Sequence, residues 1–580
     1  MWLPTEAKYK HSLMIDRTQK QYSAIGLLAV IVITALVWFR ATGVLYTSDD
    51  YQYLHHFAPM SSLADALKQF ITTDPNSQYW RSLASALAVV DFLNWGWDGR
   101  GFHITNFIIH LLTTLSVFFV AKKLFHLPQV QSLLVTLFFG IAASHEANLL
   151  WAAGRTDSLA TLFLLCTLLF EYLAIHQTQK RWLYRAAGLF CCLLSLLSKE
   201  IGIFILPLLL FLPSYETTLR KRISILIPYL VAVIVFFICW SHFTSGLNNS
   251  GPMSVSMVHN PGVIVTNTLY TLGYTLIPLD FSQALSLLNE YRATLIILIG
   301  IASLAFLGIL LLLRKIINCK KYLFPLTFTI FTGSLTMLSF ERWRVYMLSV
   351  GLFAIVVMLI FDFANLIKSK TLRVIPFVCF GVLLIFHITR TLSAENDWLR
   401  STKLLQELKT NLSHILAEHP QRPIKLLFLN RPSKLGGAPL LQLSINDLLS
   451  QAELERTHSD KLPMGGMFDT LIDSETPLLV LSLDAEKDFS AMQVKQISKD
   501  TFEFSSSDNS SLRFIPANEN RNNFASRDQQ FIVGDTLRSV YADVVLLEVQ
   551  RSVVTRARVI INDTTMLPLL FNGKQFVIVQ

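Results

Sequence analysis

Long apolar runs alternate with short polar loops over the first two thirds of the chain, up to about residue 392. Runs of about 20 residues recur there, and a helix of that length crosses a hydrocarbon core of about 30 Å. After residue 392 the chain becomes polar. The pattern predicts a polytopic all-α membrane domain, residues 23–394, followed by a soluble domain, residues 395–580.

About eleven transmembrane helices are expected from these runs, after a cytoplasmic N-terminus formed by residues 1–22. They fall near residues 23–41, 102–121, 130–149, 157–176, 184–198, 200–213, 223–242, 293–313, 322–340, 345–365 and 373–391. With the N-terminus inside, every cluster of Lys and Arg in the short loops lies on the cytoplasmic side, as the positive-inside rule requires. The C-terminal domain is then extracytoplasmic, as is the long loop 42–101.

Residues 262–279 are also apolar enough to span the membrane. Counting them as a full crossing would move the basic clusters 314–321 and 368–373 to the outer side. We therefore expect a re-entrant or interfacial helix on the outer side.

Composition agrees with a membrane protein and argues against nucleic-acid binding. Of the 580 residues, 52% are hydrophobic and only 15% are charged, and the mean hydropathy is +0.47. The net charge of +9 comes from the cytoplasmic loops, and no basic groove interleaved with aromatic residues is present. No nucleic-acid partner is expected; the partner of the apolar surface is membrane lipid.

Ionisable residues gather at the outward ends of the expected spans, whereas the bilayer midplane is nearly bare. Charge inside a membrane is costly, so this concentration on one face indicates a site there. Secondary transporters instead keep ion-binding residues near the bilayer centre, usually on broken helices of repeated halves. The chain shows no internal repeat, and the pattern favours a reaction chamber at the outer interface.

Asp49 and Asp50 follow the first span directly and precede the aromatic stretch "YQYLHHF". A solvated pair that caps a helix would be the commoner reading of adjacent aspartates. Adjacent carboxylates repel, and a carboxylate in a partly dry cleft accepts a proton from a hydroxyl group. We interpret this pair as the catalytic base of the outer site. Two carboxylates could also hold a divalent ion, so a metal is neither required nor excluded.

His103, Asn106 and His110 share one face of the second span, at positions i, i+3 and i+7. Interhelical hydrogen bonding accounts for such residues in many membrane bundles. His110 lies deeper and fits that role at least as well as chemistry. His103 and Asn106, near the outer end, are the better site candidates.

Four basic residues lie at or near the outward ends of different spans: Arg155, Lys199, Arg342 and Arg344. Singly, each would be an interfacial anchor. Together they suit a phosphate, because Arg offers a planar fork and Lys a point charge. The chain has no Gly-rich phosphate loop, so the expected ligand is a lipid phosphate at the membrane surface.

Five stretches occur in an order that resembles a known family: "YWRSL" (79–83), "GFHITNFIIH" (101–110), "SHEANLLWAAGRTDSLATLFLL" (144–165), "LLSKEIGIFILPLLLF" (196–211) and "FERWRVYMLSVGLFA" (340–354). "ENDWLRSTKLL" (395–405) is similar as well. Together they resemble the transmembrane-and-TPR O-mannosyltransferases and their bacterial relatives in the GT-C superfamily of polytopic glycosyltransferases. The resemblance covers about residues 40–410.

This resemblance implies a GT-C-like membrane fold and an inverting transfer from a polyprenyl-phosphate sugar at the extracytoplasmic face. It matches the acidic pair of the family's first outer loop to Asp49 and Asp50. Further site candidates come from the same motifs: Arg81, His145, Glu146, Asp157, Glu200 and Glu341. The chain departs from the family at Ser82, where proline is usual, in the shortened His145-Glu146 stretch, and in having no TPR array.

The C-terminal domain is expected to begin as α/β and to become β-rich. Residues 395–418 have the pattern of an amphipathic helix that leaves the membrane, and segments such as "PLLVLSLD", "TFEFSSS" and "YADVVLLEVQ" read as strands. No nucleophile or metal motif stands out there. A module that covers the site or binds an acceptor or partner is favoured over a second catalytic domain.

The sequence thus predicts a glycosyltransferase of a bacterial inner membrane, without an obligatory cofactor. The donor would be a polyprenyl-phosphate sugar, and the acceptor an unidentified glycan, lipid or protein. Two other hypotheses are a transporter or flippase of a lipid-linked substrate and a non-catalytic membrane scaffold.

Overall fold

The computed structural model describes eighteen ranges of the chain. They are residues 23–47, 50, 57, 60–72, 79–213, 218–244, 261–278, 319–338, 340–419, 426–435, 438–439, 478–485, 488–507, 512–516, 532–538, 542–550, 553–562 and 567–579. Asp49 and the expected span at 293–313 lie outside these ranges, as do residues 440–477.

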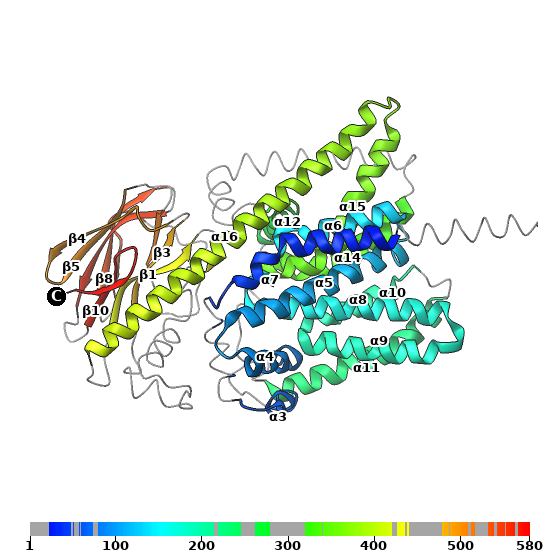
Figure 1. Cartoon of the computed structure of the whole chain (residues 1–580), viewed down its shortest axis with the longest axis horizontal. Helices are drawn as coiled ribbons and strands as arrows, with labels where there is room; N and C mark the ends of the chain where they lie inside the picture. Colours follow the sequence, from blue (N-terminus) through cyan, green and yellow to red (C-terminus); the bar gives the residue numbers. More distant parts are fainter. Residues whose placement is uncertain are drawn as a thin grey trace, which may run out of the picture.

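The N-terminal two thirds of the described chain form a helical bundle (Figure 1). Its longer helices are α4 Ser82–Trp95, α5 Gly99–Lys123, α6 Gln129–Ile141, α8 Arg155–His176, α9 Arg181–Ser198, α11 Leu219–Phe243, α12 Pro261–Leu276, α14 Leu323–Leu338, α15 Val345–Leu366 and α16 Ile375–Glu418. Shorter helices are α3 Leu63–Lys68, α7 Glu146–Leu149 and α10 Ile205–Leu210. Short 3-10 turns are η1 Phe39–Gly43, η2 Ala143–His145, η3 Ala152–Gly154, η4 Thr178–Lys180, η5 Glu200–Phe204, η8 Cys319–Tyr322, η9 Arg342–Arg344 and η10 Leu372–Val374.

Five helices of the described ranges are long and apolar enough to cross a membrane. They are Gly99–Lys123, Ala152–His176, Leu219–Phe243, Arg342–Leu366 and Leu372–Glu418. A sixth candidate is the pair Gln129–Ile141 and Ala143–Leu149, whose two parts are bent by 48° at the break between them. The protein is therefore a multi-pass membrane protein, but the expected count of about eleven spans is not confirmed.

Helices nevertheless occupy each expected span that falls in the described ranges. Ser23–Val37, Glu200–Leu210 and the 16-residue α14 are apolar but short. The segment expected to be re-entrant is the 16-residue helix α12; its position relative to the bilayer stays a prediction.

The helix α5 illustrates why these runs fold as they do. The Asp98 side chain caps its N-terminus by accepting a hydrogen bond from the backbone N–H of Arg100, at 3.1 Å. Lys122 and Lys123 occupy its last turn, where cations interact favourably with the helix dipole. The helices α5, α8, α9 and α11 pack side by side in that order, and α6 packs against α5 and α15 (Figure 1).

The C-terminal third of the chain forms a β-sheet, as the strand pattern predicts. Its strands are β1 Leu426–Leu435, β2 Ala438–Pro439, β3 Leu478–Ala485, β4 Met492–Ser498, β5 Thr501–Ser506, β6 Leu512–Pro516, β7 Thr536–Arg538, β8 Ala542–Gln550, β9 Val553–Ile561, β10 Leu567–Phe571 and β11 Phe576–Ile578. The order is β11-β10-β1-β3-β6-β9-β5-β4, with β2 beside β1, and β8 joining β7 to β9. The strand β1 is parallel to β10 and β3, and the other pairs are antiparallel.

One helix, α16, connects the bundle to the sheet (Figure 1). Its C-terminal half buries Leu405, Leu408 and Leu412 in the same apolar cluster as Phe428 of β1. That cluster also contains Phe102 and Ala152 of the bundle, together with Tyr46. We call this region, where the bundle meets the sheet, the sheet-side end of the bundle. The candidate site lies there.

Candidate functional site

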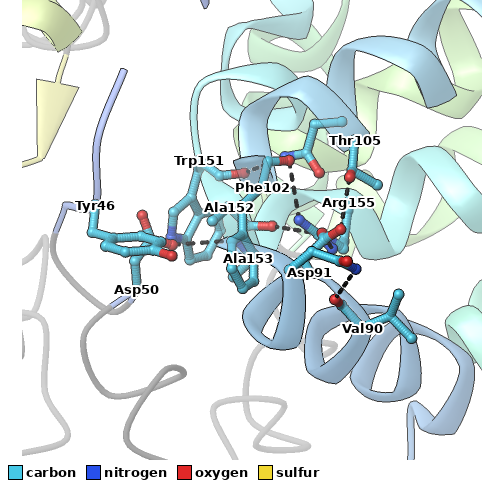
Figure 2. Close-up of polar contacts among 12 residues, drawn as sticks. Tyr46, Asp50, Val90, Asp91, Phe102, Thr105, Trp151, Ala152, Ala153 and Arg155 are labelled. Carbon is cyan, nitrogen blue, oxygen red and sulfur yellow. Dashed lines mark hydrogen bonds and ion pairs between the residues drawn. The ribbon is translucent and has the colours of Figure 1, made fainter. Parts of the chain in front are cut away.

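Asp50 is a buried carboxylate held by two backbone N–H groups. Its side chain is fully enclosed. Oδ2 accepts a hydrogen bond from the Thr47 N–H at 3.0 Å, and Oδ1 accepts one from the Ala153 N–H at 3.3 Å (Figure 2). Both oxygens of the Asp50 carboxylate therefore have a backbone N–H donor. Asp49, the other predicted base, lies outside the described residues.

Tyr46 lies beside Asp50 in the same connection between η1 and the rest of the loop (Figure 2). Burial raises the pKa of the Tyr46 phenol, and the negative charge of Asp50 raises it further. The phenol therefore stays protonated at neutral pH, and its hydroxyl donates to the Gly96 carbonyl at 3.3 Å. Tyr46 therefore contributes an uncharged side chain to this region, and the negative charge belongs to the carboxylate of Asp50.

His103 and Asn106 hold backbone carbonyls beside Asp50. Nδ1 of His103 lies 3.0 Å from the Leu149 carbonyl oxygen, and Nε2 lies 3.3 Å from that of Leu45. Nδ2 of Asn106 donates to the Trp151 carbonyl at 3.1 Å. Both predicted candidates thus lie at the site, and each contacts the segment that leads into the turn at residues 151–153.

Arg155 is enclosed at the N-terminus of α8, and its side chain has no exposed surface. Nη1 forms an ion pair with Oδ2 of Asp91 at 2.5 Å, Nη2 donates to the Phe102 carbonyl at 3.1 Å, and Nε donates to the Ala152 carbonyl at 3.2 Å (Figure 2). These three acceptors belong to α4, α5 and η3. The contact with a donor phosphate that the sequence predicts for Arg155 stays a prediction.

Lys199 and Asp157 form a second buried ion pair. Nζ of Lys199 lies 2.5 Å from Oδ2 of Asp157, which is in the first turn of α8. Burial lowers the pKa of the Lys199 ammonium to about 8, although the Asp157 charge opposes that shift. Next to Lys199 in sequence, Glu200 pairs with Arg81 at 3.1 Å. The two pairs lie close enough for the Arg81 charge to act on Lys199.

Arg342 and Glu146 form a third ion pair, and Tyr274 of α12 contacts the same carboxylate. Oε1 of Glu146 accepts from Nη1 of Arg342 at 2.7 Å and from the Tyr274 hydroxyl at 3.1 Å. The side chain of Arg342 is 21% exposed. Glu341 precedes the same turn and Arg344 ends it, and both residues are half-buried.

The turn η9 that carries Arg342 adjoins the turn at 151–153. The rings of Trp151 and Trp343 pack with centroids 5.0 Å apart. Nδ2 of Asn148 lies 3.4 Å from the Gly154 carbonyl oxygen and 3.3 Å from that of Trp343. The structure thus brings the Asp50 region and the Arg342 turn together, although they are far apart in sequence.

His145 faces the interior of the bundle. Its Nε2 lies 3.0 Å from the Ser349 hydroxyl of α15, and its ring packs against Phe139 and Tyr346. His110 contacts the Tyr346 hydroxyl at 2.8 Å and the Gly140 carbonyl at 2.9 Å. Of the two, His110 fits the interhelical role expected for it. His145 makes the same kind of contact, and its predicted place in the site stays a prediction.

Sequence reasoning missed Asp91 and the Ala153 N–H as parts of the site. Asp91 is the one acidic residue of α4, whose sequence is "SLASALAVVDFLNW", and only 5% of it is exposed. An isolated aspartate in an apolar helix was the available signal. No sequence signal identifies a backbone N–H as a hydrogen-bond donor to Asp50.

The part of the chain that the structure describes contains no group of three or more His, Cys, Asp and Glu residues that could hold a metal ion. Asp49 is outside that part, so metal binding by the aspartate pair stays untested.

Comparison with known families supports the resemblance seen in the motifs. Residues 95–243 match the family model described as dolichyl-phosphate-mannose-protein mannosyltransferase. This confirms the resemblance to that glycosyltransferase family for about a quarter of the chain. The matched residues include Arg155, Asp157, Lys199 and Glu200, whereas Asp50 and Arg342 lie outside the match. No curated protein matches the chain.

Solved structures with a similar arrangement include two of ArnT from Cupriavidus metallidurans. The one bound to undecaprenyl phosphate is 13% identical, with a TM-score of 0.40, and the match covers 80% of this chain and 95% of that chain. The one in the apo state is 13% identical, with a TM-score of 0.44 and coverage of 80% and 93%. The oligosaccharyltransferase AglB from Archaeoglobus fulgidus, in complex with an inhibitory peptide and a dolichol-phosphate, is 10% identical, with a TM-score of 0.37 and coverage of 79% and 69%.

Proposed function

We propose that the protein is an inverting glycosyltransferase that moves a sugar from a polyprenyl-phosphate donor to an acceptor hydroxyl at the outer face of a bacterial inner membrane. The observation that carries the proposal is the buried carboxylate of Asp50, held by two N–H groups beside the Arg342 turn. The family match at residues 95–243 supports glycosyl transfer. The N-terminus is then cytoplasmic and the β-sheet domain extracytoplasmic.

Asp50 acts as the general base in this mechanism. Its carboxylate takes the proton of the acceptor hydroxyl while the hydroxyl oxygen attacks the anomeric carbon. The bond between that carbon and the phosphate oxygen breaks, and its electron pair leaves with the polyprenyl phosphate. A single displacement of this kind inverts the anomeric centre. Because Asp50 is enclosed in this structure, acceptor binding has to open a path to its carboxylate.

The basic residues stabilise the charge that develops on the leaving phosphate. The donor is a phosphodiester with one negative charge, and the departing phosphate gains a second, so a nearby cation stabilises the transition state more than the ground state. Lys199 and Arg342 are the principal ligands in this proposal, and Arg81 and Arg344 are further candidates. Their carboxylate partners, Asp157 and Glu146 for the first two, hold the cations in place before the donor binds.

A dependence on pH follows from the lowered pKa of Lys199. Above a pKa of about 8 the ammonium loses its charge, so the attraction for the donor phosphate falls. We expect kcat/KM for the lipid donor to decline above about pH 8. Lys199→Arg should move that decline upward, because a guanidinium stays protonated there. Initial rates measured between pH 6 and pH 10 check this, and an identical decline in both proteins would contradict it.

The function itself is tested by following the donor's sugar–phosphate bond. The purified protein is reconstituted in liposomes that contain a polyprenyl-phosphate sugar with a labelled sugar, and acceptors extracted from membranes are added. We expect released polyprenyl phosphate and labelled acceptor in equal amounts. Movement of intact donor between leaflets without cleavage would instead identify a flippase. If the donor is neither cleaved nor moved, the protein is a non-catalytic scaffold.

One further measurement would identify the acceptor and the sugar. Mass spectrometry of glycolipids, cell-wall polymers and protein glycoforms from a deletion strain should show one class that lacks a sugar. We propose that the β-sheet domain covers the site or binds that acceptor, since it meets the bundle at the sheet-side end.

A further inference from the structure

We propose that the Asp91–Arg155 ion pair is a positioning device for Asp50, acting through a single peptide group. This inference rests on the proposed function of Asp50 as the base. It assigns Arg155 a role different from contact with the donor phosphate, and it assigns Asp91 and Thr105 roles in the same device.

The peptide group between Ala152 and Ala153 is the centre of the device (Figure 2). Its carbonyl oxygen, on Ala152, accepts from Nε of Arg155 at 3.2 Å. Its N–H, on Ala153, donates to Oδ1 of Asp50 at 3.3 Å. A trans peptide group is planar, and its C=O and N–H point in opposite directions. Fixing the oxygen therefore aims the N–H at the carboxylate.

The same geometry strengthens the hydrogen bond to Asp50. Hydrogen bonds in a chain polarise one another, so a peptide oxygen that accepts from a cation makes its own N–H a better donor. Arg155 thus acts on Asp50 through the oriented and polarised N–H of Ala153, and its guanidinium does not contact the carboxylate directly. A carboxylate held in one rotamer by such a donor is pre-organised to receive the acceptor's proton.

Arg155 is itself fixed by residues on two other helices. Oδ2 of Asp91 binds Nη1 of Arg155, while Oδ1 of Asp91 accepts from the Thr105 hydroxyl at 2.8 Å. The Phe102 carbonyl binds Nη2, and the guanidinium lies 4.9 Å from the Phe102 ring centroid. The cation is therefore held on α4 and α5 and cannot turn toward a phosphate without breaking this packing.

The segment before the turn is held independently. Asn106 binds the Trp151 carbonyl, and His103 lies between the carbonyls of Leu149 and Leu45. His103 thus lies between the segment that precedes Asp50 and the segment that precedes Ala153, and a neutral ring donates its single N–H to one of the two carbonyls. Arg155 adds the hydrogen bond to the oxygen of the 152–153 peptide itself.

The test separates kcat from KM for the lipid donor in the full-length protein reconstituted in liposomes. We expect Arg155→Gln to lower kcat about 100-fold with KM changed by less than about twofold, because misplacing a reacting group costs rate rather than binding. Arg155→Lys keeps the charge, but its ammonium cannot reach three separated acceptors, so its kcat should be about 10-fold lower. A higher KM in Arg155→Gln that Arg155→Lys restores would make Arg155 a phosphate ligand and overturn the proposal.

A double-mutant cycle with Asp50→Asn distinguishes positioning from a general loss of structure. If Arg155 acts through Asp50, Arg155→Gln should not lower further the residual kcat of Asp50→Asn. Full additivity of the two effects would overturn the proposal. Thr105→Val removes only the hydroxyl that holds Asp91 and should lower kcat about threefold at unchanged KM; if Arg155→Gln does not fold, an unchanged kcat in Thr105→Val is the overturning result.

Arg185→Gln is the matched control. It breaks an ion pair between α9 and the buried Glu171 of α8, which also accepts from Tyr229, and it does not touch the site. Its kcat should equal that of the unaltered protein. Failure of the proposed function has a different signature: Asp50→Asn would then keep full activity, or the unaltered protein would not cleave the donor. Loss of activity in Asp50→Asn with normal kcat in Arg155→Gln would reject the positioning proposal alone.

Discussion

Replacing Asp50 by asparagine is expected to lower kcat for sugar transfer by about three orders of magnitude, with little change in binding of the lipid donor. Asparagine has nearly the same shape but cannot take the acceptor's proton. Both carboxylate oxygens of Asp50 accept from backbone N–H groups, so the amide of asparagine also places an N–H against one of these donors. Because the base is lost while binding of the lipid donor changes little, the loss of activity should appear in kcat at saturating donor.

Asp65→Asn is the control for this experiment. Asp65 is a carboxylate of the same long loop, but it accepts from the backbone N–H of Ser62, the N-cap of α3, and pairs with Lys68 at 2.8 Å. Its replacement should leave kcat unchanged. Asp49→Asn is measured in parallel: loss of activity there, with full activity in Asp50→Asn, would move the base to the neighbouring residue. Full activity in both single variants and in the double variant would reject base catalysis by this pair.

The second large effect is expected for Lys199→Met, which should lower kcat/KM for the lipid donor about 100-fold. The methionine fills the space but removes the charge that meets the donor phosphate. It also leaves Asp157 buried without its cation, and breaking one side of a buried pair costs about 3 to 5 kcal/mol of folding free energy. A lower thermal midpoint should accompany the loss of activity.

Adding Asp157→Asn to Lys199→Met separates the two effects. The double variant removes the uncompensated charge, so most of the lost stability should return. The loss in kcat/KM should remain, because the cation is still missing. Recovery of kcat/KM together with stability would mean that Lys199 has only a structural role. Lys321→Met, which breaks a pair with Asp362 on α15, serves as a control with unchanged kcat/KM.

Several elements could be predicted because they depend on local sequence. An apolar run near 20 residues folds as a helix in a membrane, since each backbone polar group then bonds within its own segment. The helices α5, α8, α11, α15 and α16 confirm this. Alternating polar and apolar residues predicted β5 and β8 in the same way, and the short apolar segment "PLLVLSLD" predicted β3.

The helices of the described residues do not confirm the expected count of about eleven spans. The segment 130–149, which reads as one run, is divided between α6 and α7 with a bend of 48° at Ala142. The runs that gave α10 and α14 fold as helices of 6 and 16 residues. A hydropathy average over a window does not record where a helix breaks, because the break is set by packing against other helices.

The site, like the fold, could be predicted from the sequence only in part. The motifs alone located Asp50, Arg155, Lys199 and Arg342 at the ends of apolar runs, because charge is excluded from the membrane interior and must lie at its edges. They could not give the partner of each charge. Arg155 meets Asp91 across 64 positions and Arg342 meets Glu146 across 196.

The sequence by itself determined that this protein is a bundle of membrane helices with a β-rich C-terminal region, and that ionisable residues lie at the ends of its apolar runs. Hydrophobicity and periodicity are local properties, so these features can be read from the chain. Only the tertiary structure decided which carboxylate faces which cation, and that the 152–153 peptide group lies between Arg155 and Asp50. Hydrogen bonds act over about 3 Å, and contacts at that distance exist only after distant segments have packed together.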